Sequence, residues 1–416
     1  MAASRAGRLA RALARELAVI DPRRPIGPDD LFPEDESPAP RLVRFLSDEG
    51  LPHFGLVLES HRGVPRKLLD LTTRHGLGPG LLELVSLGGF EVAQQEIEEH
   101  DPERADPHHV RLEREELAHR LLPPVDIDYP QIEPGERLVI GFGLTYRTHQ
   151  EETGTLRPIV FPKPAAPTGA YAPVISGAEA LGGRTELLDY ELELGCVALV
   201  EIDLDRLDEI DPAVHFAYLM VNDVSARGPI LRDRRSGYAL AKGRPTFLPT
   251  GPWLVPGEHF TRDDPTLRRM VLTVIEVDRD ETEGEGERHT LRQNARLEDL
   301  TLGVRELLEL VSRQRTLTMP GVEGRRWPIS VVRGGRRVLP AGSLLLTGTP
   351  GGTAIRSPEL ADKLGLVLRS LRYLRWPSES YHRHLESYHR EFGFLSSGDR
   401  VSAWITGLGS QEWEVH

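Results

Sequence analysis

The amino-acid sequence predicts a β-rich α+β protein that consists of a small N-terminal domain and a larger second domain. Three observations predict this fold class. Strand-like segments outnumber helical ones after residue 138, Pro123 and Pro124 interrupt the chain before that point, and residues 356–395 have leucines at helical spacing. The 416 residues are 39% hydrophobic with a mean hydropathy of −0.33, which is sufficient for the core of a globular protein.

The first forty residues are expected to form a helix and a linker. Four arginines between Arg5 and Arg15 alternate with apolar residues, which fits a surface helix or an organelle presequence, and Glu16 favours the helix. Residues 21–40 are rich in Pro and Asp, a composition typical of a linker. We therefore place residues 1–40 outside the two domains.

Residues 41–124 are predicted to form the small N-terminal α/β domain. Short strand-like runs separated by Gly, Pro and polar residues come first, and two segments with helical spacing follow. The predicted strands and helices are, in order, Arg41–Phe45, Gly55–Leu58, Leu68–Leu71, Leu81–Glu98 and Leu112–Leu121. We place the domain junction between residues 122 and 135.

Residues 125–416 are predicted to form the larger second domain, in which strands predominate. The acidic segment Asp278–Arg288 is typical of an exposed hairpin end, and Leu297–Arg313 has helical spacing. The region 356–395 is predicted to be an insertion of two helices that are broken at Pro377. The predicted strands are Leu138–Gly143, Leu192–Ile202, Phe216–Val221, Val271–Val277, Ser343–Thr347 and Arg400–Ile405.

Composition excludes several classes of function. The net charge of −13 argues against general nucleic-acid binding, which requires a basic surface. No apolar run approaches the roughly 18 residues that a membrane span requires, so we expect no membrane segment. Cys196 is the only cysteine, so an intrachain disulfide is excluded and a cytoplasmic location is expected.

Three acidic residues are candidates for a metal site. On a strand, Glu191 and Glu193 project from the same face, and Asp223 follows the apolar strand Phe216–Val221. Together they would form an all-oxygen site that suits Mg²⁺, Mn²⁺ or Ca²⁺ better than zinc. Taken separately, the glutamates equally fit a solvated strand face, and Asp223 equally fits the cap of a turn.

His149 and Glu152 are candidates for a catalytic pair. They lie three residues apart, so they share one face if the segment is helical. Histidine can act as a general base near neutral pH, and a carboxylate can orient it. Taken alone, this spacing is more often a solvated surface pair.

Three cations and one loop are candidates for binding a carboxylate or a developing enolate. The chain has only four lysines among 51 basic residues, which draws attention to Lys163 and Lys242, and Arg227 follows Asp223 by four positions. In the segment Leu344–Thr353 an apolar strand enters a Gly-rich turn, whose hydroxyls and amides can hold a carboxylate. The turn lacks the lysine of a phosphate loop, and it can also be an ordinary tight turn.

The order of these segments resembles the fumarylacetoacetate hydrolase superfamily. The likeness covers roughly residues 41–410, and residues 41–124 resemble the small N-terminal domain of bacterial members. The matching segments are Thr145-Tyr-Arg-Thr-His149-Gln-Glu-Glu152, Phe161-Pro-Lys163-Pro, Asp189-Tyr-Glu191-Leu-Glu193-Leu, Val221-Asn-Asp223-Val-Ser-Ala-Arg227, Lys242 with Thr246-Phe and Gly251-Pro-Trp, Leu346-Thr-Gly-Thr349-Pro-Gly-Gly, and Ser397-Gly-Asp-Arg with Gly407-Leu-Gly.

The resemblance implies a mixed β-roll catalytic domain in a homodimer that acts on a small-molecule carboxylate. It implies a divalent cation, Mg²⁺ or alternatively Mn²⁺ or Ca²⁺. The roles that it implies are metal binding by Glu191, Glu193 and Asp223, catalysis by His149, Glu152 and Lys242, and substrate binding by Tyr146, Lys163, Arg227 and Thr349, with Lys242 also polarising the substrate.

Some substrate-contacting positions depart from the family pattern. Thr145 replaces an asparagine, Gly228 replaces a common aspartate, and Ile230 replaces a glutamine that often contacts substrate. The insertion at 356–395 is also additional. The predicted ligand set is intact, whereas the residues around it are altered.

The predicted function is metal-dependent hydrolysis of a C–C bond in a small keto or diketo acid, such as an acylpyruvate. His149, oriented by Glu152, would deprotonate the attacking water, while Lys242 lies beside the developing negative charge. Decarboxylation, hydration or isomerisation of a keto or hydroxydienoic acid are alternatives because they use the same enolate chemistry. A different class of alternative is a catalytically retired family member that acts as a binding or scaffold protein.

Overall fold

The computed structural model describes most of the chain in twelve segments. These are residues 39–101, 105–127, 137–153, 157–176, 187–232, 237–262, 268–278, 286–316, 318–320, 326–355, 385 and 389–416. The N-terminal helix and nearly all of the predicted linker therefore lie outside the described residues. So do the two helices predicted within 356–395, of which only Leu385 and residues 389–395 are described.

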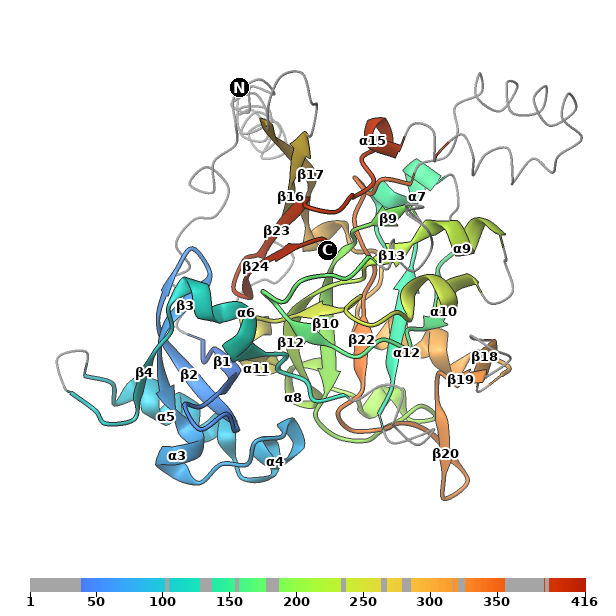
Figure 1. The fold of residues 1–416 in the computed structure, drawn as a ribbon. Coiled ribbons are helices and arrows are strands. Elements are labelled where there is room, and N and C mark those ends of the chain that lie inside the picture. The colour runs from blue at the N-terminus through green and yellow to red at the C-terminus, as the bar shows by residue number, and fades with distance from the viewer. Residues whose placement is uncertain are drawn as a thin grey trace, which may run out of the picture.

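The N-terminal part is an antiparallel five-stranded sheet with short helices, and it is coloured blue to teal in Figure 1. The sheet order is β4-β3-β2-β1-β5. Its strands are β1 (Leu42–Leu46), β2 (Pro52–His61), β3 (Val64–Asp70), β4 (His109–Arg111) and β5 (Leu121–Leu122). Its helices are α3 (Leu71–His75), α4 (Leu81–Ser86), α5 (Gly89–Glu98), the 3₁₀ turn η1 (Arg114–Glu116) and α6 (Leu117–Arg120).

The predicted helix Leu81–Glu98 is divided into α4 and α5. Gly88 has a φ of 69°, a left-handed conformation that ends one helix and starts the next. Helical spacing of apolar residues continues across the break, so the spacing alone predicted a single helix.

The central sheet contains both parallel and antiparallel strand pairs. Its order is β7-β6-β22-β10-β12-β14-β8, and β15 pairs with β12 beside this path. β22 pairs with β6 in parallel, as does β14 with β8, whereas β10 pairs antiparallel with both β12 and β22. The strands are β6 (Val139–Gly143), β7 (Ile159–Pro162), β8 (Thr168–Gly169), β10 (Leu192–Ala198), β12 (Phe216–Asn222), β14 (Pro249–Thr250), β15 (Val255–Pro256) and β22 (Leu344–Leu346).

A four-stranded antiparallel sheet, in the order β17-β16-β23-β24, comes from residues 269–414 (Figure 1). Its strands are β16 (Arg269–Asp278), β17 (Gly286–Arg296), β23 (Arg400–Ile405) and β24 (Gly409–Glu414). Smaller ladders join β9 (Leu188–Asp189) to β13 (Ser225–Ala226), and β18 (Thr318–Pro320) to β19 (Arg326–Pro328). In a three-stranded ladder, β21 (Arg336–Leu339) lies between β11 (Ile202–Asp203) and β20 (Val331–Arg333).

Helices in the larger part are short. The predicted helix Leu297–Arg313 is a 3₁₀ turn followed by a helix, because Gly303 separates the two. The helices and turns are α7 (Arg147–Thr153), η3 (Leu207–Glu209), α8 (Pro212–His215), α9 (Arg227–Arg232), α10 (Gly237–Lys242), α11 (Gly257–Arg262), η5 (Leu297–Asp299), α12 (Val304–Ser312) and α15 (His389–Phe392). The predicted β-rich, mixed fold is confirmed.

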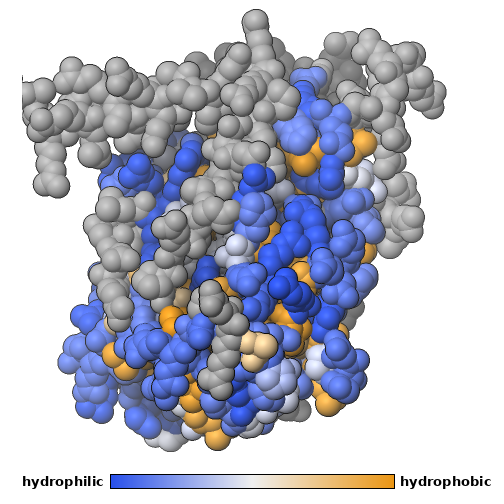
Figure 2. Space-filling model, turned by 90° about the vertical axis from the view of Figure 1, so that its left-hand side faces the viewer, coloured by the Kyte–Doolittle hydropathy of each residue, from blue (hydrophilic) through white to orange (hydrophobic). Residues whose placement is uncertain are grey.

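The N-terminal sheet packs directly on the central sheet. Leu42 and Leu254 exchange two backbone hydrogen bonds of 2.9 and 2.7 Å. Buried apolar side chains of β1 and β2, such as Phe54, share a hydrophobic cluster with Val197 and Leu219 of the central sheet. Figure 2 shows that the face on the side of the N-terminal sheet is largely hydrophilic, with small separate apolar areas. Among the described residues, no helix is both long and apolar enough to cross a membrane.

Candidate metal centre

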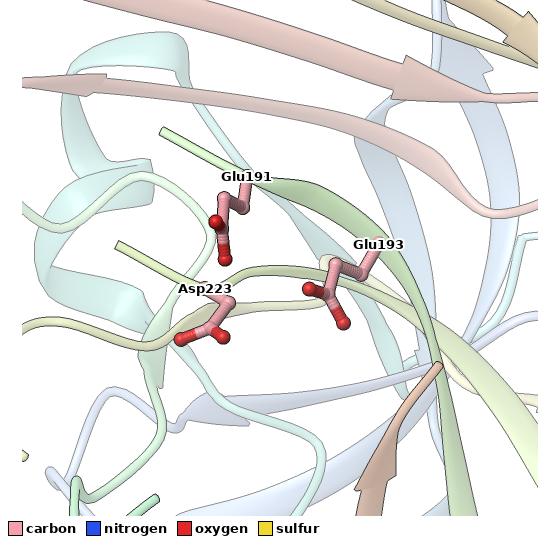
Figure 3. Close-up of side chains that lie close together, drawn as sticks. All are labelled: Glu191, Glu193 and Asp223. Carbon is pink, nitrogen blue, oxygen red and sulfur yellow. The ribbon is translucent and has the colours of Figure 1, made fainter. Parts of the chain in front are cut away.

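Three carboxylates converge where β10 begins and β12 ends. Glu191 and Glu193 flank Leu192 at the start of β10, and Asp223 follows Asn222, the last residue of β12. The two strands are antiparallel, with Leu192 opposite Asn222, so the start of one meets the end of the other. Figure 3 shows the three carboxylates turned toward one another. One oxygen from each lies within 4.8 Å of the others.

All three side chains are buried: Glu191 is 5% exposed, Glu193 is 1% exposed and Asp223 is 0% exposed. The solvated strand face that the sequence left open is therefore excluded for the glutamates. Three buried carboxylates repel one another unless cations compensate their charge. The donor set contains only hard oxygen atoms, which fits Mg²⁺, Mn²⁺ or Ca²⁺ and not the nitrogen and sulfur ligands that zinc prefers.

Lys242, the last residue of α10, contacts two of these carboxylates. Its Nζ lies 2.5 Å from Glu191 Oε2 and 2.6 Å from Asp223 Oδ2, and it donates a 2.8 Å hydrogen bond to Ser225 Oγ. Burial lowers the pKa of Lys242, but Asp223 and Glu191 outweigh burial and the net shift is upward. Its ammonium also lies 5.1 Å from the centre of the Phe161 ring.

Lys163 neutralises Asp223 from the other side. Its Nζ lies 2.5 Å from Asp223 Oδ1 and donates to the backbone carbonyls of Lys242 at 2.9 Å and Val224 at 3.2 Å. Lys163 is fully buried, and burial lowers its pKa even though Asp223 favours the charged form. Both lysines that stood out in an arginine-rich sequence therefore reach the same carboxylate.

Arg227 links Glu191 to Asp189, a residue for which the sequence analysis predicted no role. Its Nε donates to Asp189 Oδ2 at 2.8 Å, and its Nη2 donates to Glu191 Oε1. Asp189 is fully buried and also accepts the backbone N–H of Ala354 at 2.9 Å. Burial raises the pKa of Glu191, but Arg227 and Lys242 outweigh it and hold that pKa below its ordinary value.

Glu193 has a different environment. Its Oε2 accepts a 2.7 Å hydrogen bond from the backbone N–H of Gly348. Burial, followed by the nearby charges of Asp223 and Glu191, raises the pKa of Glu193 well above its ordinary value. A bound cation would favour the ionised carboxylate, so this group fits a metal ligand.

His149 lies in α7 and is buried, with 7% of its surface exposed. It is near enough to Glu191 for its charged form to lower the pKa of that carboxyl. The predicted pairing with Glu152 stays a prediction, because the Glu152 side chain lies outside the described part of the structure.

Tyr146 and Thr349, both predicted to bind substrate, are engaged within the protein. Tyr146 is fully buried, and its hydroxyl donates to Met270 Sδ at 3.1 Å. The Thr349 hydroxyl donates to the Leu192 carbonyl at 3.0 Å and accepts from Gln293 Nε2 at 2.8 Å. Substrate contact by either residue stays a prediction.

The departure at Thr145 has a structural role. Its hydroxyl donates to the Thr347 carbonyl at 2.6 Å, and its own carbonyl accepts the backbone N–H of Thr301 at 2.8 Å. Thr145 therefore joins the start of α7 to the loop that follows β22. Sequence reasoning missed this contact, and it also missed Asp189 and Gln293, because these side chains act through partners that are distant in the sequence.

The comparisons with known proteins support the same family. A family model described as fumarylacetoacetate (FAA) hydrolase C-terminal matches residues 138–416, which is more than half of the chain. The chain is 28% identical over 237 residues to the oxaloacetate tautomerase YisK of Bacillus subtilis, a match that spans 56% of this chain and 64% of that protein. It is 33% identical over 187 residues to a putative hydrolase of Burkholderia cenocepacia, a match that spans 44% of this chain and 58% of that protein. Both matches span less than two thirds of the relative.

Solved structures of the same fold cover nearly the whole chain. A fumarylacetoacetate hydrolase from Exiguobacterium antarcticum has a TM-score of 0.52 at 21% identity and covers 91% of this chain and 99% of its own. Maleylpyruvate hydrolase from Sphingobium sp. SYK-6, in complex with manganese(II) ion and pyruvate, has a TM-score of 0.50 at 21% identity and covers 90% and 98%. These likenesses show the fold. The similar proteins include hydrolases, a probable isomerase and a tautomerase. Because the family model matches more than half of the chain, the chain belongs to the fumarylacetoacetate hydrolase family.

Proposed function

We propose that this protein is a divalent-metal-dependent enzyme that hydrolyses a C–C bond in a small keto or diketo acid. The observation that carries the proposal is the convergence of three buried carboxylates, one oxygen of each within 4.8 Å of the others, with three buried cations around them. Glu191, Glu193 and Asp223 would hold Mg²⁺ or Mn²⁺. When bound, such a cation supplies Lewis acidity toward a keto oxygen, which is worth several kcal/mol of charge stabilisation.

Charge balance supports an anionic substrate. Glu191, Glu193, Asp223 and Asp189 carry four negative charges when ionised, and Lys163, Lys242 and Arg227 carry three positive charges. A divalent cation would therefore leave the centre with one net positive charge. A carboxylate or an enolate compensates that charge.

His149 is the proposed general base. It accepts a proton from water, whose oxygen forms a bond to the carbonyl carbon remote from the carboxylate. The adjacent C–C bond then breaks as the attacked carbon becomes a carboxylic acid, and the electron pair of that bond passes to the keto-acid fragment, which takes the proton from His149. Lys242, whose Nζ contacts Glu191 and Asp223, would stabilise the negative charge that develops on this fragment. We propose that Glu152 orients His149, and that the protein acts as a homodimer.

Tautomerisation of a keto acid is a second candidate function. The 28% identity to an oxaloacetate tautomerase favours it. The reaction requires only proton transfer beside a stabilised enolate, without water attack. The same carboxylates and cations would serve both reactions, so only identification of the reaction products can distinguish hydrolysis from tautomerisation.

The test uses the purified full chain with Mg²⁺ or Mn²⁺. An acylpyruvate and oxaloacetate are each incubated with the enzyme, and the products are followed by NMR. Hydrolysis predicts pyruvate and a free acid from the acylpyruvate, whereas accelerated keto–enol exchange without cleavage would support the tautomerase. Absence of both reactions, together with no Mn²⁺ binding by calorimetry, would instead indicate the retired binding or scaffold protein.

Ligand variants make this test specific. Glu193→Gln and Asp223→Asn are expected to abolish metal-dependent turnover while the protein stays folded. The matched control is Glu201→Gln, because Glu201 follows β10 and forms only a partly exposed ion pair with Arg333. Full turnover by either ligand variant would refute the proposed metal site.

A further inference from the structure

A β-bulge in the β16–β17 hairpin alters the register next to the candidate metal centre. Leu272 lies opposite Gln293 and Thr273 lies opposite Leu291, so Arg292 is the extra residue on β17. Bulges turn nearby side chains away from the regular alternation and are common beside active sites. Arg292 forms an ion pair with Glu276, and the next residue, Gln293, is fully buried.

The amide group of Gln293 contacts both the ligand-bearing strand and the loop after β22. Its Oε1 accepts the backbone N–H of Leu192 at 3.0 Å. Its Nε2 donates to Thr349 Oγ1 at 2.8 Å and to the Pro350 carbonyl at 3.0 Å. Both amide protons and the carbonyl oxygen are therefore used.

Thr349 completes a ring of hydrogen bonds that connects Gln293, Thr349 and Leu192. Its hydroxyl donates to the carbonyl of Leu192 at 3.0 Å, so both backbone polar groups of Leu192 are bound by Gln293 and Thr349. Leu192 stands between Glu191 and Glu193 in the chain, and its two peptide units are the ones that join it to these glutamates. A displacement of Leu192 would therefore displace both carboxylates.

The same loop binds Glu193 directly. Gly348, next to Thr349, donates its backbone N–H to Glu193 Oε2 at 2.7 Å. Gln293 binds Thr349 and Pro350, which directly follow Gly348, and it also binds Leu192, which precedes Glu193. It therefore ties the Gly348 N–H donor to the strand that carries Glu193. The hairpin β16–β17 is thereby connected to the candidate ligands through one side chain.

We propose that Gln293 is a positioning residue that holds Leu192 and the loop 348–350 in register and so orients Glu191 and Glu193 toward the cation. This inference rests on the proposed function, because it assigns Gln293 to the same metal site. Residues that orient metal ligands typically change metal affinity by about 10- to 100-fold when they are substituted.

The test compares Mn²⁺ affinity by calorimetry in Gln293→Met and in the wild-type full chain. Methionine has a similar size but removes all three hydrogen bonds, so the dissociation constant is expected to rise about 10- to 100-fold. The matched control is Gln411→Met, because Gln411 is also fully buried and its Nε2 donates to the carbonyls of Met220, Pro249 and Gly251. Folding of each variant is checked by circular dichroism.

A positioning role requires that Gln293→Met weakens Mn²⁺ binding clearly more than Gln411→Met does. If the two variants bound Mn²⁺ with equal affinity, Gln293 would have no more effect on the site than another buried amide, and the proposal would be overturned. If Gln293→Met does not fold, Gln293→Asn takes its place, since it keeps the amide but is too short to reach both Leu192 and Pro350. A folded Gln293→Asn with wild-type affinity would also overturn it.

Glu193→Gln separates this inference from the proposed function. If Glu193→Gln binds Mn²⁺ as the wild type does, the metal site itself fails. If Glu193→Gln loses Mn²⁺ while Gln293→Met retains wild-type affinity, the metal site stands and only the role of Gln293 is refuted.

Discussion

Lys242 Nζ lies 2.5 Å from Glu191 Oε2, and both side chains are buried. The ammonium therefore stabilises a carboxylate that the protein has removed from water. Without Lys242, Glu191 keeps Arg227 and Asp223 keeps Lys163, but the buried acidic cluster loses one of its three cations. Removal of one partner from a buried ion pair costs about 3–5 kcal/mol.

We therefore predict that Lys242→Met lowers the free energy of unfolding of the metal-free protein by about 3–5 kcal/mol. Urea denaturation followed by circular dichroism measures this change. With saturating Mg²⁺ the loss is expected to be smaller, because the cation then compensates the same carboxylates.

Lys67→Met is the matched control for this prediction. Lys67 is one of the four lysines and is also largely buried, but its partner Glu59, at 3.4 Å, has a side chain that is 54% exposed. An ion pair with a solvated partner is worth about 0–1 kcal/mol, and loss of Lys67 leaves no buried carboxylate without its cation. Equal losses of stability in Lys67→Met and Lys242→Met would contradict a special role for the ammonium beside the three carboxylates.

A second prediction concerns the pH dependence of metal binding. Burial, Asp223 and Glu191 raise the pKa of Glu193, so the metal-free centre binds a proton that a cation must displace. Metal affinity is therefore expected to rise as the pH rises toward the raised pKa, and to level off above it. Calorimetry in two buffers with different ionisation enthalpies should detect the released proton.

The raised pKa of Glu193 also adds a pH-dependent contribution to the stability of the metal-free protein. A carboxyl with a raised pKa binds its proton more tightly in the folded state than in the unfolded chain. The contribution of Glu193 to stability therefore falls as the pH rises from the ordinary pKa of glutamate to the raised value. The Glu193→Gln variant should lack this part of the pH dependence. If the Mn²⁺ affinity did not change with pH between the ordinary and the raised pKa of Glu193, the assignment of Glu193 as a metal ligand would be contradicted.

Local rules predicted which strand segments carry the three carboxylates, and the family resemblance, not periodicity, implied that they form one metal site. Glu191 and Glu193 alternate with apolar residues along a strand, and Asp223 directly follows another strand. Antiparallel pairing of these strands then brings the three carboxylates together. The rarity of lysine also drew attention to Lys163 and Lys242, which both contact Asp223.

The supporting residues could not be predicted in this way. Gln293 reaches Leu192 across 101 positions of sequence, and its direction depends on a bulge at Arg292 that no sequence pattern marked. Asp189 was visible beside the two glutamates, but its partner Arg227 is known only from the tertiary structure. Side chains that position a site by binding backbone groups do not follow the regular spacing of a helix or strand, so no sequence pattern identifies them.

The third prediction concerns Gly348, whose backbone N–H binds Glu193. Gly348 has a φ of +95°, and an added Cβ would lie 2.0 Å from Thr145 Oγ1. Gly348→Ala therefore forces the loop or Thr145 to move. We expect a rise of about 10- to 100-fold in the Mn²⁺ dissociation constant, because the donor to Glu193 moves with the loop.

Gly334→Ala is the control that separates the expected loss of Mn²⁺ affinity in Gly348→Ala from the energetic cost of a side chain in a left-handed backbone conformation. Gly334 has a φ of +56°, and nothing lies within 4 Å of its added Cβ. Both variants carry the penalty of roughly 1–2 kcal/mol for a side chain in that conformation, but only Gly348→Ala also clashes. Calorimetry should therefore show wild-type Mn²⁺ affinity in Gly334→Ala and weakened binding in Gly348→Ala. If the two variants bound Mn²⁺ equally well, the contact between Gly348 and Glu193 would have no part in holding the ligand.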